Sequence, residues 1–382
     1  MNTRRATPAD VAARADAAFA PSAEVRIGAE VEWLVFDRSD LTRRIDAADV
    51  ARIASGLLPG GGAVTIEPGG QVELVTPPHD GPRQLIDAIE SDTRVLARRF
   101  GNRGLVLVPL GLDPIREPVR TLDVARYEAM ERYFKEVSPA GVRMMNLTAS
   151  LQLNIDFGSN PKRSWERAHA VAPVLAAAFA NSPTTDGTSY RRTSNRMRIW
   201  AATDPTRTRP VGPSTDDWLP YIRAAKVLPS TAPADVVDPA VLRPFGEWVD
   251  GSNPPSLTNL DRHITTLFPP VRPRGYLEFR MLDALPTVGR AAAIATVWAL
   301  MVDDGVSEAV TGTCQALGDA WRLVHDEGLD NAALSAAVTS VLDRVARSSE
   351  PQLAESVVAW SEWSGHDARR VDELIALAEA VG

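Results

Sequence analysis

An apolar run from Arg26 to Asp37 has the length of a buried β-strand, and it carries two glutamates two residues apart. Because side chains alternate between the faces of a strand, Glu30 and Glu32 point to the same face, while the apolar residues beside them point to the other. Two carboxylates on one partly buried face repel each other and lose hydration, so each must hold a proton or face a cation. A divalent metal ion is the simpler solution; the alternative is a solvated sheet edge on which both glutamates face water.

The segment Ala63–Pro78 adds two carboxylates to this pattern. It predicts a hairpin, with one strand ending at Glu67, a turn at Pro68-Gly69-Gly70 and a second strand over residues 71–76. Glu73 lies inside the otherwise apolar second strand, and Glu67 lies directly before the turn. The hairpin therefore predicts a third and a fourth carboxylate beside an apolar core.

Strict alternation of polar and apolar residues over Met144–Phe157 predicts an antiparallel strand with one core face. Its polar face, which includes Gln152 and Asn154, avoids lysine and glutamate. A face of amides and hydroxyls favours a surface lined by ligand over one exposed to solvent alone.

Arginine is concentrated in one segment of a chain that is acidic overall. Five arginines lie between Arg191 and Arg207, interleaved with threonine and serine. They suit recognition of phosphates or carboxylates, although a solvated basic loop is the alternative. A predicted strand over Gly275–Asp283 places Glu278 and Arg280 on one face, as a structural ion pair or as part of a site.

The predicted strands together contribute a set of oxygen donors, without paired histidines or cysteines. Such hard ligands select magnesium or manganese over zinc, and magnesium held by carboxylates often binds substrate phosphates. No glycine motif for nucleotide binding of the Walker or dinucleotide type is present. ATP-dependent activation of a carboxylate is the reaction class that this set suggests. The donors are Glu30, Glu32, Glu67, Glu73, Gln152 and Glu278.

The rest of the chain predicts an α+β protein in which helices surround an antiparallel sheet. Residues 1–22 read as a leading helix, residues 23–285 as the catalytic sheet domain, and residues 286–382 as a helical region packed on that domain. Histidines at positions 169, 325 and 366 fall on helical stretches away from the carboxylates, so we expect packing or surface roles for them.

Composition excludes several classes of function. With 41 Lys and Arg against 49 Asp and Glu, the net charge of -8 argues against nucleic-acid binding. One cysteine, Cys314, makes a disulfide within the chain impossible, and we expect it to be a packing residue in a reducing cytoplasm. The N-terminus does not read as a signal peptide, and the longest apolar run is too short to span a bilayer.

Six motifs in this order resemble the glutamate-cysteine ligase family, of the plant-like and actinobacterial type, and are most similar to the ligases of the ergothioneine pathway. The resemblance covers about Val25 to Asp283. The motifs are Gly28-x-Glu30-x-Glu32, Glu67-Pro-Gly-Gly-Gln-Val-Glu73-Leu, Leu151-Gln-Leu-Asn154, Ile199-Trp-x-x-x-Asp-Pro-Thr-Arg-Thr208, His263-Ile-Thr-Thr-Leu-Phe-Pro-Pro-Val271 and Gly275-Tyr-Leu-Glu278-x-Arg280.

This resemblance implies a curved antiparallel sheet that forms a funnel, similar to glutamine synthetase, with helices outside. It implies that the chain makes gamma-glutamylcysteine from L-glutamate, L-cysteine and ATP, for ergothioneine or a related thiol. Magnesium, or manganese in its place, would be the metal. The implied metal ligands are Glu30, Glu32, Glu67, Glu73 and Glu278; the implied catalytic arginines are Arg196 and Arg280; and the implied residues for substrate and ATP are Gln152, Asn154, Arg196, Arg207 and Arg280.

One departure leaves the acceptor amine open. The ergothioneine-pathway ligases often carry a Met-Arg-Cys type of run before the alternating strand, whereas this chain has Met144-Met145-Asn146. A ligase that joins glutamate to another amine is therefore the alternative. A binding protein without catalysis is disfavoured, because every acidic motif position is intact. The oligomeric state and the match between individual arginines and anions stay open at this level, and a monomer is compatible with the sequence.

Overall fold

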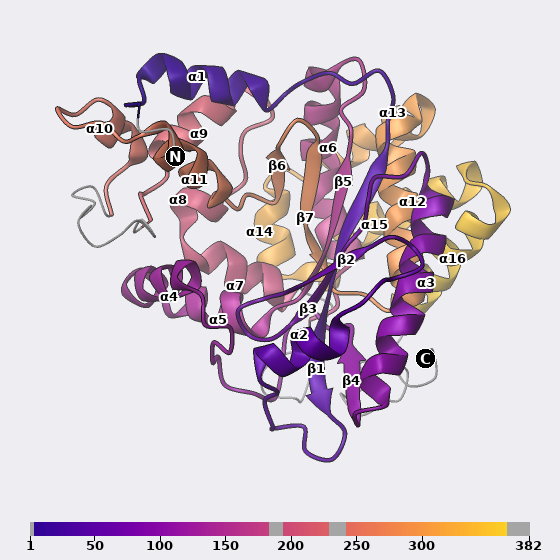
Figure 1. Ribbon diagram of the computed structural model, residues 1–382. Coiled ribbons are helices and arrows are strands. Elements are labelled where there is room, and N and C mark those ends of the chain that lie inside the picture. The colour runs from indigo at the N-terminus through magenta and orange to yellow at the C-terminus, as the bar shows by residue number, and fades with distance from the viewer. Residues whose placement is uncertain (1–3, 183–193, 229–241, 365–382) are drawn as a thin grey trace.

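The structure is a computed structural model that describes residues 4–182, 194–228 and 242–364. Within these residues one antiparallel sheet runs in the order β2-β3-β1-β5-β7-β6, and β4 pairs with the far half of β1 (Figure 1). The predicted hairpin, with its turn at Pro68-Gly69-Gly70, is confirmed as β2 and β3. The strands are β1 (Ile27–Asp37), β2 (Ala63–Ile66), β3 (Val72–Val75), β4 (Leu105–Val108), β5 (Ser150–Ile155), β6 (Val271–Pro273) and β7 (Leu277–Asp283).

The long strand β1 is the centre of the sheet. Its first half lies between β3 and β5, with Glu32 opposite Glu73 and Glu30 opposite Gln152. Its second half leaves both neighbours and pairs with β4. This register brings carboxylates and an amide from three strands onto one face, as the alternation of side chains requires.

The prediction of one strand over Met144–Phe157 is wrong in its first part. A helix continues to Leu147, and β5 begins only at Ser150. The side chains there bond to the helix backbone: Asn146 Nδ2 donates to the Val142 carbonyl at 3.0 Å. Alternation over residues 144–147 did not reveal this helix, because all four side chains are buried there.

Helices cover the apolar face of the sheet, which packs into the main core. In Figure 1 the C-terminal helices, orange to yellow, gather on one side of the sheet with α3 and α6. Direct contacts join α3 to β1, α12 to β5 and α6 to β7. These helices are α3 (Pro82–Gly101), α6 (Pro161–Ala178), α12 (Thr287–Val302), α13 (Asp304–Gln315), α14 (Ala320–Asp326), α15 (Ala332–Ser348) and α16 (Pro351–Ser364).

A second group of helices lies at the other side of the sheet, where α5 contacts both α4 and α7. The alternative that the arginine cluster is a solvated loop is wrong for Asn195–Thr203, because these residues form helix α7 with Ser194 as its N-cap. Arg191 and Arg192 of the cluster lie outside the described residues. The remaining helices are α1 (Pro8–Ala17), α2 (Ala47–Ala54), α4 (Ala125–Val137), α5 (Pro139–Leu147), α8 (Pro205–Thr208), α9 (Trp218–Ala224), α10 (Phe245–Val249) and α11 (Leu257–Thr265).

A small second core closes the carboxylate face at one end. Beyond Glu32 the same face of β1 carries Leu34 and Phe36, which are buried against β4 in a cluster separate from the main core. The α+β class with an antiparallel sheet and a helical C-terminal region is confirmed, and the division into three segments stays a prediction. No helix of the described residues is long and apolar enough to cross a membrane.

Candidate active site

A cavity of about 330 Å³ lies over the carboxylate-bearing face of the sheet. Most of the site residues predicted from the sequence line it, although they come from segments far apart in the chain. The exceptions are Asn154, Arg207 and Glu278, which are not among its lining residues. The predicted residues that do line it are Glu30, Glu32, Glu67, Glu73, Gln152, Arg196 and Arg280.

The carboxylates are held by neighbours on the strands. Glu32 accepts hydrogen bonds from the backbone amide of Ser150 at 2.8 Å and from its hydroxyl at 2.9 Å. Gln152 Nε2 donates to the same carboxylate at 3.2 Å, and Asn154 Nδ2 donates to Glu30 at 3.3 Å. Asn154 therefore supports a cavity carboxylate from outside the cavity.

Burial and the charges of neighbouring carboxylates raise the pKa of three cavity glutamates, which makes them difficult to ionise. Burial and the charges of Glu32 and Glu30 raise the pKa of Glu73 to about 8. Burial and the neighbouring Glu73 raise the pKa of Glu67 well above its ordinary value. Burial likewise raises the pKa of Glu32, although Arg196 opposes the shift. A cation bound among them would relieve both effects.

The donor set fits magnesium in chemistry, since all four cavity glutamates offer hard oxygen ligands. Among the described residues, however, no group of three or more acidic, histidine or cysteine side chains stands close enough to hold a metal ion. The carboxylates share a cavity without converging on one point. Binding a metal would therefore require their side chains to turn toward it.

Two buried arginines form another part of the cavity wall. Arg196 lies 3.8 Å from Asp283 Oδ1, and the Nη1 of Arg280 donates to Gln152 Oε1 at 2.5 Å. The Nε atoms of both arginines are buried without a hydrogen-bond partner. Both guanidinium groups stand over Trp200, at 5.1 and 5.7 Å from its ring centre. They are positioned to donate to an anion in the cavity.

Glu278 binds arginines in the structure. Its carboxylate pairs with Arg272, with Arg280 at 3.1 Å and with Arg274 at 3.3 Å. Although burial opposes ionisation, these arginines hold the pKa of Glu278 far below its ordinary value. Both oxygens are occupied by cations, so Glu278 gathers three arginines of the cavity wall.

Arg207 is fully enclosed between α4, α8 and α11, away from the cavity lining. Its Nε pairs with Asp204 Oδ2 at 2.8 Å, and its Nη1 donates to the Thr266 carbonyl at 2.8 Å. Its Nη2 donates to the Tyr133 hydroxyl at 3.3 Å and to the Lys226 carbonyl. The donors of Arg207 are thus used inside the protein.

Sequence reasoning missed two further parts of the cavity lining. The first is Arg272, which lies opposite Glu278 in the β6–β7 pair. A hairpin over residues 271–279 with its turn at Gly275 would have predicted this pairing. The other part is the wall from α4 and α5, hidden because α5 was read as a strand. That wall comprises Arg126, Tyr127, Met130, Met144 and Met145.

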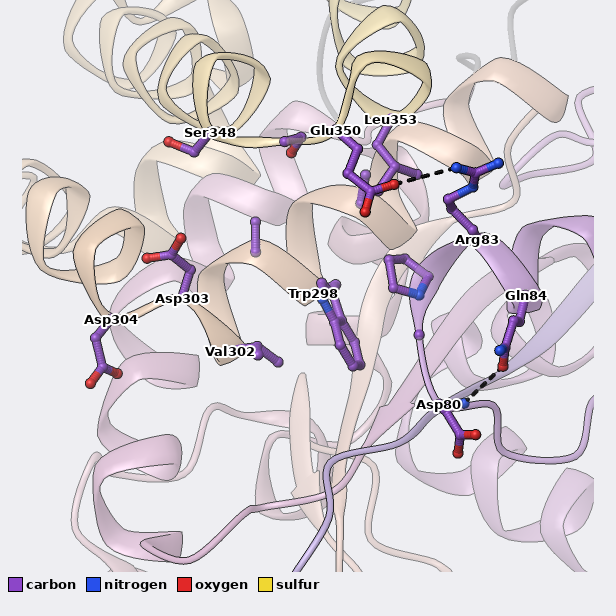
Figure 2. Close-up of a pocket in the computed structure, with 15 residues that line it drawn as sticks. Asp80, Arg83, Gln84, Trp298, Val302, Asp303, Asp304, Ser348, Glu350 and Leu353 are labelled. Atoms are coloured by element: carbon purple, nitrogen blue, oxygen red, sulfur yellow. Dashed lines mark hydrogen bonds and ion pairs between the residues drawn. The ribbon is translucent and has the colours of Figure 1, made fainter.

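A larger cavity of about 830 Å³ lies between α3, α12 and α16 (Figure 2), and none of the predicted site residues lines it. Three of its four carboxylates are engaged in structural contacts, and Asp80 is the fourth. Asp303 caps α13, Asp304 pairs with Arg167 at 2.6 Å, and Glu350 pairs with Arg83 at 3.4 Å. We therefore assign the chemistry to the smaller cavity.

Comparison with known proteins matches most of the chain to the family that the six sequence motifs resemble. The family model described as glutamate-cysteine ligase family 2 matches residues 26–373. A glutamate-cysteine ligase EgtA of Mycolicibacterium smegmatis is 38% identical over 350 residues, which cover 87% of this chain and 82% of that protein. EgtA of Mycobacterium tuberculosis is 40% identical over 299 residues, covering 73% of this chain and 68% of that protein.

More distant relatives share part of their length or only the fold. The chloroplastic glutamate-cysteine ligase of Arabidopsis thaliana is 30% identical over 272 residues, which cover 67% of this chain and 52% of that protein. The crystal structure of a glutamate-cysteine ligase from Francisella tularensis in complex with AMP superposes with a TM-score of 0.57 at 12% identity. That match covers 95% of this chain and 89% of the other, and shows likeness of fold.

Proposed function

The chain belongs to glutamate-cysteine ligase family 2, and from this premise we propose that it joins L-glutamate to L-cysteine at the expense of ATP. The product is gamma-glutamylcysteine, formed for ergothioneine or a related small thiol. The observation that carries the proposal is one cavity in which four glutamates lie with Arg196 and Arg280. A reducing cytoplasm, which keeps the cysteine substrate as a thiol, is the compartment that suits it.

The reaction needs no nucleophile from the protein. The gamma-carboxylate of glutamate attacks the gamma-phosphorus of ATP, which forms gamma-glutamyl phosphate and releases ADP. The neutral amine of cysteine then attacks the acyl carbon, the amide bond forms, and inorganic phosphate leaves with the bonding electrons of the broken C–O bond. The work of the protein is to position these groups and to stabilise negative charge.

Magnesium bound by the four cavity glutamates would neutralise phosphate oxygens of ATP and orient the gamma-phosphoryl group. The residues proposed to hold it are Glu30, Glu32, Glu67 and Glu73. Ser150, Gln152 and Asn154 hold two of these carboxylates in place.

The arginines take the complementary role. We assign the transferred phosphoryl group and the carboxylates of glutamate to Arg196 and Arg280, whose unpartnered Nε atoms are supporting observations. For Glu278 we propose a positioning role, because three arginines already occupy its carboxylate. For Arg207 we propose a structural role, because its donors are used within the protein.

Phosphate release from ATP tests the function, with magnesium and L-glutamate present and product mass measured in parallel. We expect release with L-cysteine or 2-aminobutyrate and a gamma-glutamyl dipeptide as product. Release with other amines but not with cysteine would move the chain to the alternative, a ligase for another amine. Glu73→Gln should lower the rate of release by about 10²- to 10³-fold. Asp304→Asn in the larger cavity is the matched control that should leave the rate unchanged.

A further inference from the structure

One wall of the active-site cavity differs in chemistry from the rest. Four glutamates and four paired arginines lie elsewhere in the lining, whereas α4 and α5 contribute an arginine, a tyrosine and three methionines. Methionine is a minor residue in this chain, with 7 among 382 residues, yet three of the seven meet at this wall. The concentration of thioether side chains in a charged cavity calls for a ligand with an apolar part.

Arg126 is the available cation of this wall. The other arginines of the lining each lie within 4 Å of a carboxylate: Arg196 beside Asp283, and the remainder around Glu278. No ion pair joins Arg126 to any other residue in the described part of the chain. Its guanidinium group is therefore free to bind a carboxylate brought by a ligand.

Arg126 and the methionines form one surface. Arg126 and Met130 are four residues apart on α4, so they lie on the same side of that helix. Met144 and Met145 come from α5, which packs against α4. Unbranched, polarizable thioethers suit contact with a short thiol side chain and offer no strong hydrogen bond to a hydroxyl group.

The wall is fixed relative to the carboxylates. The amide of Gln71 donates to the Thr148 carbonyl at 2.7 Å, which ties the β2–β3 hairpin to the end of α5. A Cβ on Gly69 would lie 2.2 Å from the Asn146 carbonyl oxygen, so the turn after Glu67 touches α5 directly. A ligand held on this wall would thus stand at a defined place beside Glu67.

We propose that this wall is the subsite for the acceptor amino acid: Arg126 binds its alpha-carboxylate, and Met130, Met144 and Met145 contact its short side chain. The proposal rests on the proposed ligase function and names how the second substrate is selected. The acceptor amine would then lie between the wall and the carboxylate face, where the activated glutamate must be.

The carboxylate contact is tested by comparing cysteine with cysteamine, which has the same amine and thiol but no carboxylate. We expect the wild-type kcat/KM to be about 10- to 100-fold higher for cysteine, the range expected for a hydrogen bond to a charged group. In Arg126→Met this preference should fall to near one, and in Arg126→Lys it should fall part of the way. The KM values for ATP and glutamate should stay within about twofold of wild type, since neither substrate uses this wall.

Arg132→Met is the matched control, because Arg132 is an exposed arginine on the same helix that does not line the cavity. It should keep the preference for cysteine. Each preference is a ratio measured within one variant, so a general loss of activity cancels. A ratio that stays at its wild-type value in Arg126→Met, or a KM for ATP that rises as much as that for cysteine, would overturn the proposal.

The side-chain contact is tested by comparing 2-aminobutyrate with serine, whose side chains differ by a methyl group in place of a hydroxyl. The wild type should favour 2-aminobutyrate by about tenfold to 100-fold. Met145→Gln, of similar length but polar, should reduce this ratio, whereas Met145→Leu should retain it. An unchanged ratio in Met145→Gln would remove the methionines from acceptor selection.

The ligase function and the acceptor subsite are contradicted by different results. If the wild type forms no gamma-glutamyl product with any amine, the ligase function itself is wrong, and the acceptor subsite with it. If product forms with cysteine and every variant keeps the wild-type preferences, the function stands and the subsite is elsewhere.

Discussion

Replacing Arg207 with methionine should destabilise the protein and leave the affinity for ATP unchanged. Arg207 has no exposed surface, and its guanidinium group joins Asp204 to the Thr266 and Lys226 carbonyls. A methionine restores the packing of the aliphatic stem only. It leaves a buried carboxylate without its cation and two carbonyls without this donor.

The magnitude follows from these contacts. Breaking a buried ion pair by removing one partner costs about 3 to 5 kcal/mol. Each orphaned carbonyl adds about 1 to 3 kcal/mol, but these contributions overlap because they share one side chain. Asp204 keeps the Tyr133 hydroxyl at 2.6 Å and the Thr206 amide at 3.0 Å, which reduces the loss. We expect a net cost of about 4 kcal/mol, a large part of the stability of an ordinary domain.

Urea unfolding of wild type and Arg207→Met measures the change, and the KM for ATP is measured at a temperature where both are folded. Arg209→Met is the control: this nearby exposed arginine stands over Tyr221 at 5.0 Å and should cost about 1 kcal/mol or less. A structural role for Arg207 is refuted if Arg207→Met unfolds at the same urea concentration as wild type and raises the KM for ATP tenfold or more. Arg207 would then bind the nucleotide, as the sequence motif implied.

Three further outcomes can be measured. Glu73→Gln should lower kcat by about 10²- to 10³-fold in the phosphate-release assay, since it removes a central carboxylate. In metal-free buffer at pH 8 the same variant should raise the free energy of unfolding. Burial and its neighbours raise the pKa of Glu73 from 4.5 to about 8, so ionising this carboxylate costs stability. Burial lowers the pKa of His263 to about 3, so below pH 6.5 the unfolded state binds more protons than the folded state. The free energy of unfolding should therefore fall by about 1.4 kcal/mol for each pH unit below 6.5. Denaturant titrations from pH 7 to 5 should show a smaller slope in His263→Gln, and an unchanged slope would contradict this role of His263. Gly69→Ala should cost about 1 to 3 kcal/mol in thermal unfolding, because its Cβ would meet the Asn146 carbonyl at 2.2 Å; a wild-type melting temperature would show that the turn can move.

The strands that carry the carboxylates could be predicted from the sequence, because their pattern is local. Alternation in the first strand fixed the shared face of Glu30 and Glu32, and the Pro68-Gly69-Gly70 turn fixed the hairpin that presents Glu67 and Glu73. Side-chain direction in a strand depends on parity alone, so it needs no knowledge of the neighbours. Most of the cavity glutamates followed from this rule.

The roles of the charged residues could not be predicted in the same way, because they depend on partners distant in the chain. Arg207 and Glu278 read as ligand-binding residues in their motifs, yet the fold surrounds each with groups that use its hydrogen-bonding capacity. Tyr133 and Lys226, which bind Arg207, lie far from it in sequence. The wall from α4 and α5 was missed for a related reason: residues 144–147 of α5 are all buried, so burial there gives no helical period to separate them from a strand.

The second core over the far half of the first strand limits how far the cavity extends along that strand. Leu34 and Phe36 are packed against the fourth strand, and the cavity lining on this strand stops at Glu32. Along this strand the packing of Leu34 and Phe36 therefore marks where the polar lining ends, and Glu32 is the last carboxylate that the strand offers to a ligand.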